Sequence, residues 1–289
     1  LINNIPNNSG KEWLDSIAYN QKVVDFTKKI AQDGLSKGDF GIYMELIRDE
    51  EKFTKDYGGS NSNVNYLTGT IKDLIENEKL NERINSQYSE YSKLQKELSK
   101  NKTKVYLVKG NLAKEQDLKK IIKFSKDKLK YFDCLVNNAS LFENDNLKNF
   151  TSKSWGNHIN VNLKAPAYLT KEFAKNTRGK NNNIINIIDQ RVFKLTPFFT
   201  SYTLSKTGLY TLTKTSAMSL APNVRVNGIA PGPTIKNQRQ TDKHFKKQYL
   251  ATPLKRQVDV EQICNAVDFF IKNRSITGQV LAIDSGQNL

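Results

Sequence analysis

The sequence contains few cysteines, few histidines and no long apolar run. Cys134 and Cys264 lie 130 positions apart with no second cysteine near either, a usage that suits a reducing compartment and argues against a zinc or redox motif. The two histidines, His158 and His244, also lack the spacing of metal ligands, so we expect no metal site. No apolar stretch approaches the ~18 residues of a membrane span, and no charged-then-apolar leader opens the chain. These absences predict a soluble, cytoplasmic protein without a membrane partner.

Acidic residues are scarce in the second part of the chain only. Residues 1–100 carry 14 basic and 16 acidic side chains, whereas residues 101–289 carry 31 and 13, and the net charge is +16. This shift indicates two segments of different character. The positive excess would attract an anionic ligand or partner, or it reflects a lysine-rich solvated surface. Nucleic-acid binding is not favoured, because no recognisable binding motif accompanies the charge.

Residues 1–100 show mainly helical patterns. Apolar residues recur three or four positions apart over 11–57 and again over 71–98, and the stretch "GGSNSN" at 58–63 between them has the composition of a flexible joint. We therefore expect a mainly helical N-terminal region up to residue 100.

Residues 101–289 alternate between strand and helix patterns. Strands are predicted at 104–112, 132–140, 183–189, 224–234 and 279–284, and helices at 114–129, 154–176, 201–221 and 260–273. Strands that are nearly all apolar and alternate with helices indicate an α/β fold, a doubly wound parallel sheet covered on both faces. In such sheets ligands bind at the carboxyl ends of the strands, which is where "NNAS", Asp189 and "PGPT" fall.

A tyrosine and a lysine share one helix face just after the strand that ends near Asp189. Tyr202 and Lys206 are four positions apart, which makes them neighbours on a helix. A nearby ammonium favours the phenolate and lowers the pKa of a tyrosine, which suits a general acid. Tyr210 and Lys214 have the same spacing, but we interpret that pair as ordinary helix surface, since no strand end precedes it.

Five motifs within 101–289 resemble those of the short-chain dehydrogenase/reductases. They are "LVNNAS", "NVNL", "YTLSK", "VRVNGIAPGPT" and "ITGQVLAIDSGQ", and they occur in the order of that family. The resemblance implies a Rossmann-like domain, an NAD(P)H-dependent oxidoreductase activity and a homodimer or homotetramer formed through helices equivalent to 155–177 and 202–221. The positive charge favours NADPH over NADH.

Asp189 and Phe142 direct the resemblance to the pteridine reductase branch, which includes dihydromonapterin and dihydrofolate reductase-type members. Most of the family has a serine 13 residues before the tyrosine, whereas Asp189 stands there in this chain. A carboxylic acid can donate or relay a proton to a ring nitrogen of a pterin. Phe142 falls where that branch stacks an aromatic ring on the pterin. Without the resemblance, Asp189 would be interpreted as a strand-end cap and Phe142 as a core residue.

The resemblance also implies roles for individual residues. Tyr202 would protonate the substrate, and Lys206 would lower the Tyr202 pKa and hold the nicotinamide ribose. Asn162 would anchor a water that relays protons near Lys206. The remaining cofactor contacts would come from Asn138, Ala139, Ser140, Pro231, Gly232 and Thr234.

The glycine-rich turn that grips the dinucleotide in this family is not recognisable in the sequence. The best candidate is "NYLTGTIKDLIENE", where Gly69 stands alone, and Asn111 replaces the usual acid that contacts the adenosine. An alternative hypothesis is therefore a reductase-like domain that binds no cofactor and serves as a scaffold or interaction protein.

Overall fold

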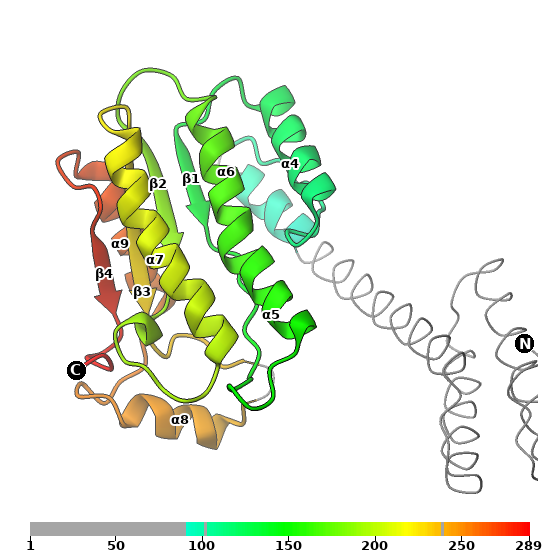
Figure 1. Ribbon diagram of the computed structural model, residues 1–289. Helices are drawn as coiled ribbons and strands as arrows, with labels where there is room; N and C mark the ends of the chain where they lie inside the picture. Colours follow the sequence, from blue (N-terminus) through cyan, green and yellow to red (C-terminus); the bar gives the residue numbers. More distant parts are fainter. Residues whose placement is uncertain (1–90, 101–102, 238–239) are drawn as a thin grey trace, which may run out of the picture. The chain divides into compact units, whose positions relative to one another are not determined.

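The computed structural model describes residues 91–100, 103–237 and 240–289 (Figure 1). The chain divides into two compact units, Leu1–Leu107 and Val108–Leu289. In the described part of the first unit, residues 91–99 are helical, and Gln95 Nε2 donates to the Val105 carbonyl at 2.6 Å. The helices predicted over 11–57 and 71–90, the joint at 58–63 and the turn around Gly69 lie outside the described residues.

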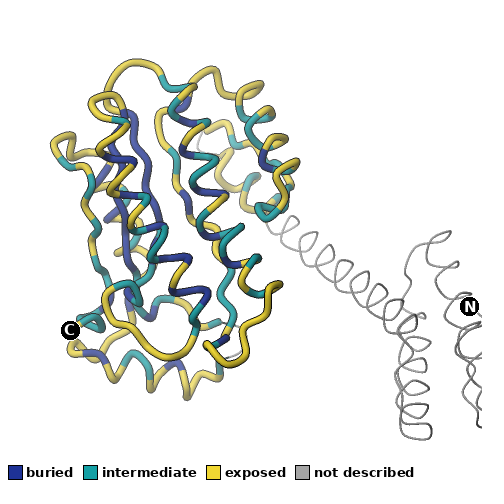
Figure 2. Tube along the Cα trace, viewed as in Figure 1, coloured by how far each residue is buried: buried dark blue, intermediate teal, exposed yellow. Residues whose placement is uncertain are grey.

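The second unit contains a parallel sheet of four strands in the order β1-β2-β3-β4. Its strands are β1 (Cys134–Asn137), β2 (Asn182–Ile187), β3 (Val224–Pro231) and β4 (Val280–Ile283). The register pairs Ile184 with Leu135 on one side and with Val226 on the other. The central strands β2 and β3 are buried along almost their whole length (Figure 2). The predicted parallel α/β sheet is thus confirmed.

The strand predicted at 104–112 is wrong. This segment has no regular secondary structure, and Lys104 and Tyr106 are exposed. An extended segment becomes a strand only when a neighbouring strand satisfies its backbone hydrogen bonds. No strand within the described ranges pairs with this segment, and the apolar pattern by itself does not supply that partner.

Helices cover both faces of the sheet. The order along the chain is α4 (Glu115–Lys128), α5 (Ser152–Ile159), α6 (Ala165–Ala174), α7 (Thr200–Leu220), α8 (Asp242–Leu250) and α9 (Val260–Lys272). Figure 1 shows α6 and α7 on one face and α9 on the other. Ile184 packs with Phe173 and Ala217 on the first face, and the next residue of β2, Ile185, packs with Phe270 on the second. Successive side chains of a strand point to opposite faces, so β2 presents an isoleucine to each of the two helical layers.

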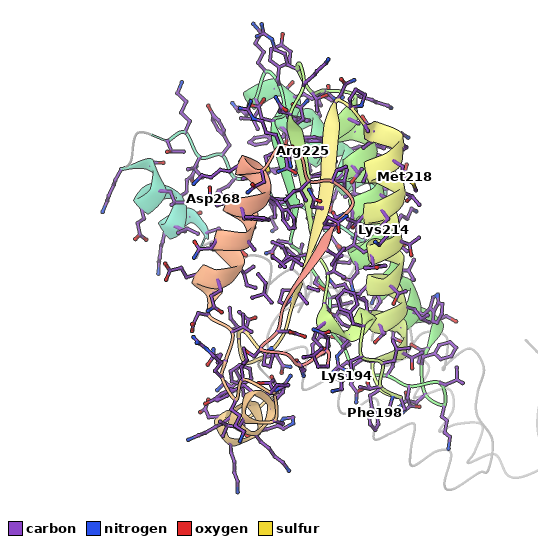
Figure 3. The ribbon with its side chains drawn as sticks, turned by 90° about the vertical axis from the view of Figure 1, so that its left-hand side faces the viewer. Lys194, Phe198, Lys214, Met218, Arg225 and Asp268 are labelled. Atoms are coloured by element: carbon purple, nitrogen blue, oxygen red, sulfur yellow. The ribbon has the colours of Figure 1, made fainter. Side chains whose placement is uncertain are left out.

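Figure 3 shows the outer sides of these two layers. Asp268 on α9 and Met218 on α7 lie on opposite sides of the sheet and point away from it, and Met218 is 74% exposed. No helix in the described part of the chain is long and apolar enough to cross a membrane.

The helix predicted at 154–176 contains a π-helical turn, Asn160–Lys164 (η1), between α5 and α6. Pro166 follows this turn and has no backbone N–H to donate to the preceding turn, so the regular ladder is interrupted there. The Ala165 N–H reaches the Asn160 carbonyl instead. The wider turn carries Asn162, which is buried beneath the loop that follows β1.

Helix α8 was not predicted from the sequence. Phe245 is its only buried residue, so the apolar pattern that marks an amphipathic helix is almost absent. Its start is nevertheless capped, because the Thr241 hydroxyl accepts a hydrogen bond from the His244 N–H at 3.2 Å.

Candidate active site

Asp189 and Tyr202 meet at the carboxyl end of the sheet. Asp189 lies two residues after the end of β2, and Tyr202 lies in the first turn of α7. The Tyr202 hydroxyl donates a hydrogen bond to Asp189 Oδ2 at 2.7 Å. The other carboxylate oxygen of Asp189 accepts the Arg191 N–H at 2.8 Å and caps the short 3-10 turn Gln190–Val192 (η2). Asp189 is therefore both a strand-end cap and the partner of Tyr202.

Burial raises the pKa values of both members of this pair, and the contact with Asp189 raises that of Tyr202 further. Loss of water raises the pKa of the Asp189 carboxyl, and the hydrogen bonds from Arg191 and Tyr202 oppose this only in part. Tyr202 is 4% exposed. Its pKa lies well above the ordinary value, first because of burial and then because the charge of Asp189 disfavours the phenolate. Both groups therefore hold their protons more strongly than free side chains do.

The predicted effect of Lys206 on the Tyr202 pKa is wrong. Lys206 Nζ donates to the Ile187 carbonyl at 2.9 Å and lies 5.8 Å from the centre of the Tyr202 ring. Burial, with 2% exposed, lowers the pKa of Lys206 from 10.5 to about 8. The spacing predicted the shared helix face correctly, but burial and Asp189 set the direction of the Tyr202 pKa shift.

Asn162 holds the loop that follows β1 in place. Its Oδ1 accepts the Leu141 N–H at 2.8 Å, and its Nδ2 donates to the Leu141 carbonyl at 2.9 Å. The same Nδ2 lies 3.0 Å from Ser205 Oγ, and Ser140 Oγ lies 3.3 Å from Asn162 Oδ1. Asn162 thus joins the β1 loop to α7. Its contacts on the loop, Ser140 and Leu141, are the two residues that precede Phe142.

Phe142 contacts Tyr202 through an aromatic cluster. Its ring packs edge-to-face on Tyr202, with centroids 4.7 Å apart, and stacks in parallel on Phe199 at 4.5 Å. The guanidinium of Arg191 lies 4.5 Å from the centre of the Phe199 ring. Phe142 therefore lies against Tyr202, and Phe199 stacks on the Phe142 ring. Sequence reasoning did not identify Phe199 or the stacked position of Arg191.

The predicted cofactor residues lie along the carboxyl edge of the sheet. Asn138 and Ala139 line a small pocket at the end of β1, which also includes Leu112, Val136, Asn137, Val161, Pro166 and Leu169. Pro231 ends β3, and the Gly232 N–H donates to the Ile283 carbonyl at 2.9 Å. Thr234 Oγ1 donates to the Gly232 carbonyl at 3.1 Å. The Lys206 ammonium is buried and donates to the carbonyl of Ile187, the last residue of β2, so it lies at the same edge of the sheet.

Two other residues singled out in the sequence have local structural contacts. Asn111 organises the turn before α4, where its N–H donates to Asp117 Oδ2 at 2.7 Å and its Oδ1 accepts the Ala113 N–H at 2.9 Å. Tyr210, interpreted from the sequence as ordinary helix surface, is half-buried and packs edge-to-face on Phe193 at 5.8 Å.

A buried polar chain beside Tyr202 was missed entirely by sequence reasoning. Asp145, His158 and Ser201 are connected by hydrogen bonds, although they come from a loop, α5 and α7. Ser201 lies 43 and 56 positions from its two partners, so no local spacing could have indicated the contact.

Comparison with known proteins agrees with the motifs. The family described as enoyl-(acyl carrier protein) reductase matches residues 82–288 and so begins before the predicted boundary at 101. A 3-oxoacyl-(acyl-carrier-protein) reductase FabG from Thermotoga maritima is 30% identical over 182 residues, which are 61% of this chain and 74% of the relative.

Solved structures with the same fold include two from Brucella. FolM alternative dihydrofolate reductase 1 from Brucella canis, complexed with NADP, is 39% identical, with a TM-score of 0.65 over 68% of this chain and 78% of the other. The Brucella suis protein, also with NADP, is 38% identical, with a TM-score of 0.65 over 68% and 79%. Together with the matched family, the parallel sheet and the Asp189–Tyr202–Lys206 site, these likenesses show that the chain belongs to the short-chain dehydrogenase/reductase family of NAD(P)H-dependent oxidoreductases.

Proposed function

We propose that the protein is an NADPH-dependent reductase that acts on a pterin or a similar heterocycle. The observation that carries the proposal is the 2.7 Å hydrogen bond from the Tyr202 hydroxyl to Asp189 Oδ2. In this arrangement a carboxylic acid and a phenol would both face the reacting group of the substrate. A carbonyl reductase, by contrast, needs only hydroxyl groups at these two positions. The 39% identity to a protein described as an alternative dihydrofolate reductase supports the same substrate class.

Asp189 and Tyr202, which both have raised pKa values, would supply the proton for this chemistry. Bound NADPH supplies the hydride. A carboxyl whose pKa is raised stays protonated at a higher pH than a free aspartate, so Asp189 can donate a proton to a ring nitrogen. The Tyr202 hydroxyl, hydrogen-bonded to the same carboxyl, is the second group that would protonate the substrate. Phe142 and Phe199 offer an aromatic surface beside this pair.

The proposed cofactor contacts divide into two groups. Lys206 and Tyr202 would bind the nicotinamide ribose from α7. The β1 loop and the end of β3 would contribute Asn138, Ala139, Ser140, Pro231, Gly232 and Thr234. Asn162, which joins the β1 loop to α7, would fix the position of this loop relative to Tyr202 and Lys206. It would also hold a water that relays protons.

Two other functions compete with this one. A 3-oxoacyl reductase is suggested by the name of the 30% identical relative, but Asp189 stands at the position of the serine that would bind a carbonyl. A cofactor-free scaffold is suggested by the unrecognised glycine-rich turn, whose region lies outside the described residues. The buried, perturbed lysine favours an enzyme, because such groups are concentrated at functional sites.

Steady-state oxidation of NADPH by the full chain tests the proposal. The substrates are dihydrofolate, a dihydropterin and an acetoacetyl thioester, and calorimetric titration with NADPH and NADH accompanies them. We expect NADPH binding in the micromolar range and a higher kcat/KM on a pterin than on the thioester. Higher activity on the thioester would indicate the carbonyl reductase, and absence of both binding and turnover would indicate the scaffold.

We also propose a homodimer or homotetramer formed through α5, α6 and α7. Leu204 and Met218 on α7 and Trp155 on α5 are large apolar side chains with substantial exposure, and exposed apolar groups of this kind commonly mark interfaces. Light scattering coupled to size-exclusion chromatography measures the mass directly. A monomer at micromolar concentration would contradict this assembly.

A further inference from the structure

Asp145 caps α7 from a distant part of the chain. Phe199, the N-cap residue, provides no side-chain cap. Its N–H donates to the Asp145 carbonyl at 2.6 Å, and the Thr200 N–H reaches the same oxygen at 3.3 Å. The Ser201 N–H donates to Asp145 Oδ1 at 3.1 Å. The first N–H groups of a helix have no partner within the helix, and an anion is favoured beside them. One residue thus satisfies three successive N–H groups at the start of α7.

Ser201 and His158 extend this cap into a one-way chain of hydrogen bonds. The Glu143 N–H donates to His158 Nε2 at 3.1 Å, which makes Nε2 an acceptor and places the ring proton on Nδ1. Nδ1 lies 2.6 Å from Ser201 Oγ and donates to it. The Ser201 hydroxyl then donates to Asp145 Oδ2. His158 and Ser201 therefore each accept one hydrogen bond and donate one, and the Asp145 carboxylate is the final acceptor.

This series of hydrogen-bonded side chains is closed to solvent. His158 and Ser201 are 0% exposed, and Asp145 is 4% exposed. Burial lowers the pKa of His158, with the nearby Asp145 and Glu143 charges opposing it, so the neutral ring that the chain requires is favoured. Polar groups buried this deeply are costly to leave without a partner, so the direction of each bond is strongly specified.

The hydrogen-bonded series lies next to Tyr202, a proposed proton donor. Ser201 immediately precedes Tyr202, and the His158 ring packs edge-to-face on the Tyr202 ring at 6.0 Å. Glu143, whose N–H begins the series of hydrogen bonds, follows Phe142, whose ring also packs edge-to-face on Tyr202. Between them Phe199 has φ 60°, a left-handed conformation that is unfavourable for a residue with a Cβ atom. The contacts with Asp145 and with the Phe142 ring hold it there.

We propose that Asp145, Ser201 and His158 are positioning residues that hold the Tyr202 hydroxyl against Asp189. None of the three hydrogen-bonds to Tyr202 or Asp189 side chains among the contacts described, so they act through the first turn of α7 and through the β1 loop. The proposal rests on the proposed function, in which Tyr202 takes part in proton transfer.

Ser201→Ala and Asp145→Asn test the proposal in the full chain. Ser201→Ala removes the link between the ring and the carboxylate. Asp145→Asn keeps the shape of the side chain and the backbone cap, but it places an amide N–H opposite the Ser201 hydroxyl. That hydroxyl already accepts a hydrogen bond from His158 and would lose the acceptor for its own proton. We expect kcat/KM for the pterin to fall about 10- to 100-fold in each, because small misplacements of a reacting group have effects of this size. Binding of NADPH should change less than twofold. Asp268→Asn, on the exposed side of α9, is the matched control.

A double substitution shows whether the effect passes through Tyr202. Once Tyr202→Phe has removed the hydroxyl, its position no longer matters. Ser201→Ala combined with Tyr202→Phe should therefore be no slower than Tyr202→Phe alone. If Ser201→Ala lowers the rate by the same factor in both backgrounds, the proposal is overturned.

Fluorine NMR of protein labelled with 3-fluorotyrosine reports the position of Tyr202 without any turnover. The resonance absent from Tyr202→Phe identifies the residue, whose hydroxyl is influenced by Asp189, Arg191 and Ser140. In Ser201→Ala this resonance should titrate at a lower pH, because the hydroxyl has moved away from Asp189. Unchanged titration overturns the proposal whatever the activity. Changed titration with full activity supports the positioning role and refutes the proposed function instead.

His158 provides a second pair of variants if Ser201→Ala or Asp145→Asn does not fold. Glutamine keeps one donor and one acceptor, whereas leucine keeps the bulk of the ring without either. We expect His158→Gln to retain most of the rate and the wild-type titration of Tyr202, and His158→Leu to lose both. Equal behaviour of these two variants overturns the proposal.

Discussion

The hydroxyl of Tyr202 donates its hydrogen bond to Asp189, a residue thirteen positions earlier, and not to a residue of its own helix. The bond joins the end of β2 to the start of α7 across the carboxyl edge of the sheet. It places two groups with raised pKa values in contact at the position where this fold binds its ligands.

The first prediction concerns the proton of Asp189. Asp189→Asn keeps the oxygen that accepts the Arg191 N–H, so the fold and Tm should be retained. The transferable proton is lost, and pterin reduction should fall by about 10²- to 10⁴-fold, the usual contribution of a general acid. The measurement is kcat/KM with one pterin and one ketone. Asp189→Ser should remain poor on the pterin and gain weak activity on the ketone.

Two tyrosine variants serve as controls for this prediction. Tyr202→Phe should damage both reactions, whereas Tyr210→Phe, whose ring packs on Phe193, should leave the rates nearly unchanged. A stable Asp189→Asn protein with full activity would reduce the carboxylate to a strand cap and remove the pterin assignment.

The second prediction is a pH dependence of stability caused by Lys206. Its pKa is about 8 in the folded chain and 10.5 ordinarily, because burial disfavours the charge. Between these values the unfolded chain binds a proton that the folded chain has released, so the free energy of unfolding rises with pH through this window. The gain should approach about 3 kcal/mol by its upper end.

Lys206→Met should abolish this rise, as measured by urea unfolding at pH 7.5 and pH 10. Lys214→Met, on the exposed side of α7, keeps Lys206 and should show the wild-type dependence. Comparing the two variants cancels the contributions of other titrating groups. An identical pH dependence in both would contradict the buried position of the Lys206 ammonium.

The third prediction concerns the aromatic surface beside the catalytic pair. Phe142→Leu keeps an apolar side chain but removes the ring that stacks on Phe199 and Tyr202. Stacking of a base on an aromatic ring contributes about 1–3 kcal/mol, so KM for the pterin should rise roughly 10-fold, with NADPH binding unchanged. Phe193→Leu, whose ring packs on Tyr210, is the control and should leave KM unchanged.

The fourth prediction compares two glycines. A Cβ atom on Gly232 would meet the Asp284 Cα at 2.6 Å, whereas one on Gly156 in α5 would meet nothing within 4 Å. Gly232→Ala should therefore cost roughly 1–3 kcal/mol, as overpacking does. Gly156→Ala should stabilise by about 0.5–1 kcal/mol, because glycine is unfavourable within a helix. Chemical denaturation of both variants measures the two signs, and a stabilised Gly232→Ala would contradict the close approach of the β3 and β4 ends.

Local order in the sequence determined most of the sheet and its helices. Ile184 and Ile185 are adjacent apolar residues of one strand and point to opposite faces, so their pattern requires a covering layer on each face. The four-residue spacing of Tyr202 and Lys206 likewise placed both side chains on one helix face, and the motifs identified the family. These inferences succeeded because they depend on the order of residues within short segments of the sequence.

The tertiary structure decided whatever depends on partners far away in sequence. The 104–112 segment has an apolar pattern but no strand within the described ranges beside it, and α8 is a helix with a single buried residue. The pKa of Tyr202 follows burial and Asp189 and not the neighbouring lysine. Asp145 caps α7 through a hydrogen-bond network that spans 56 positions. Desolvation and long-range hydrogen bonds arise only when the chain has folded, and they determine how strongly Tyr202 and Asp189 hold their protons.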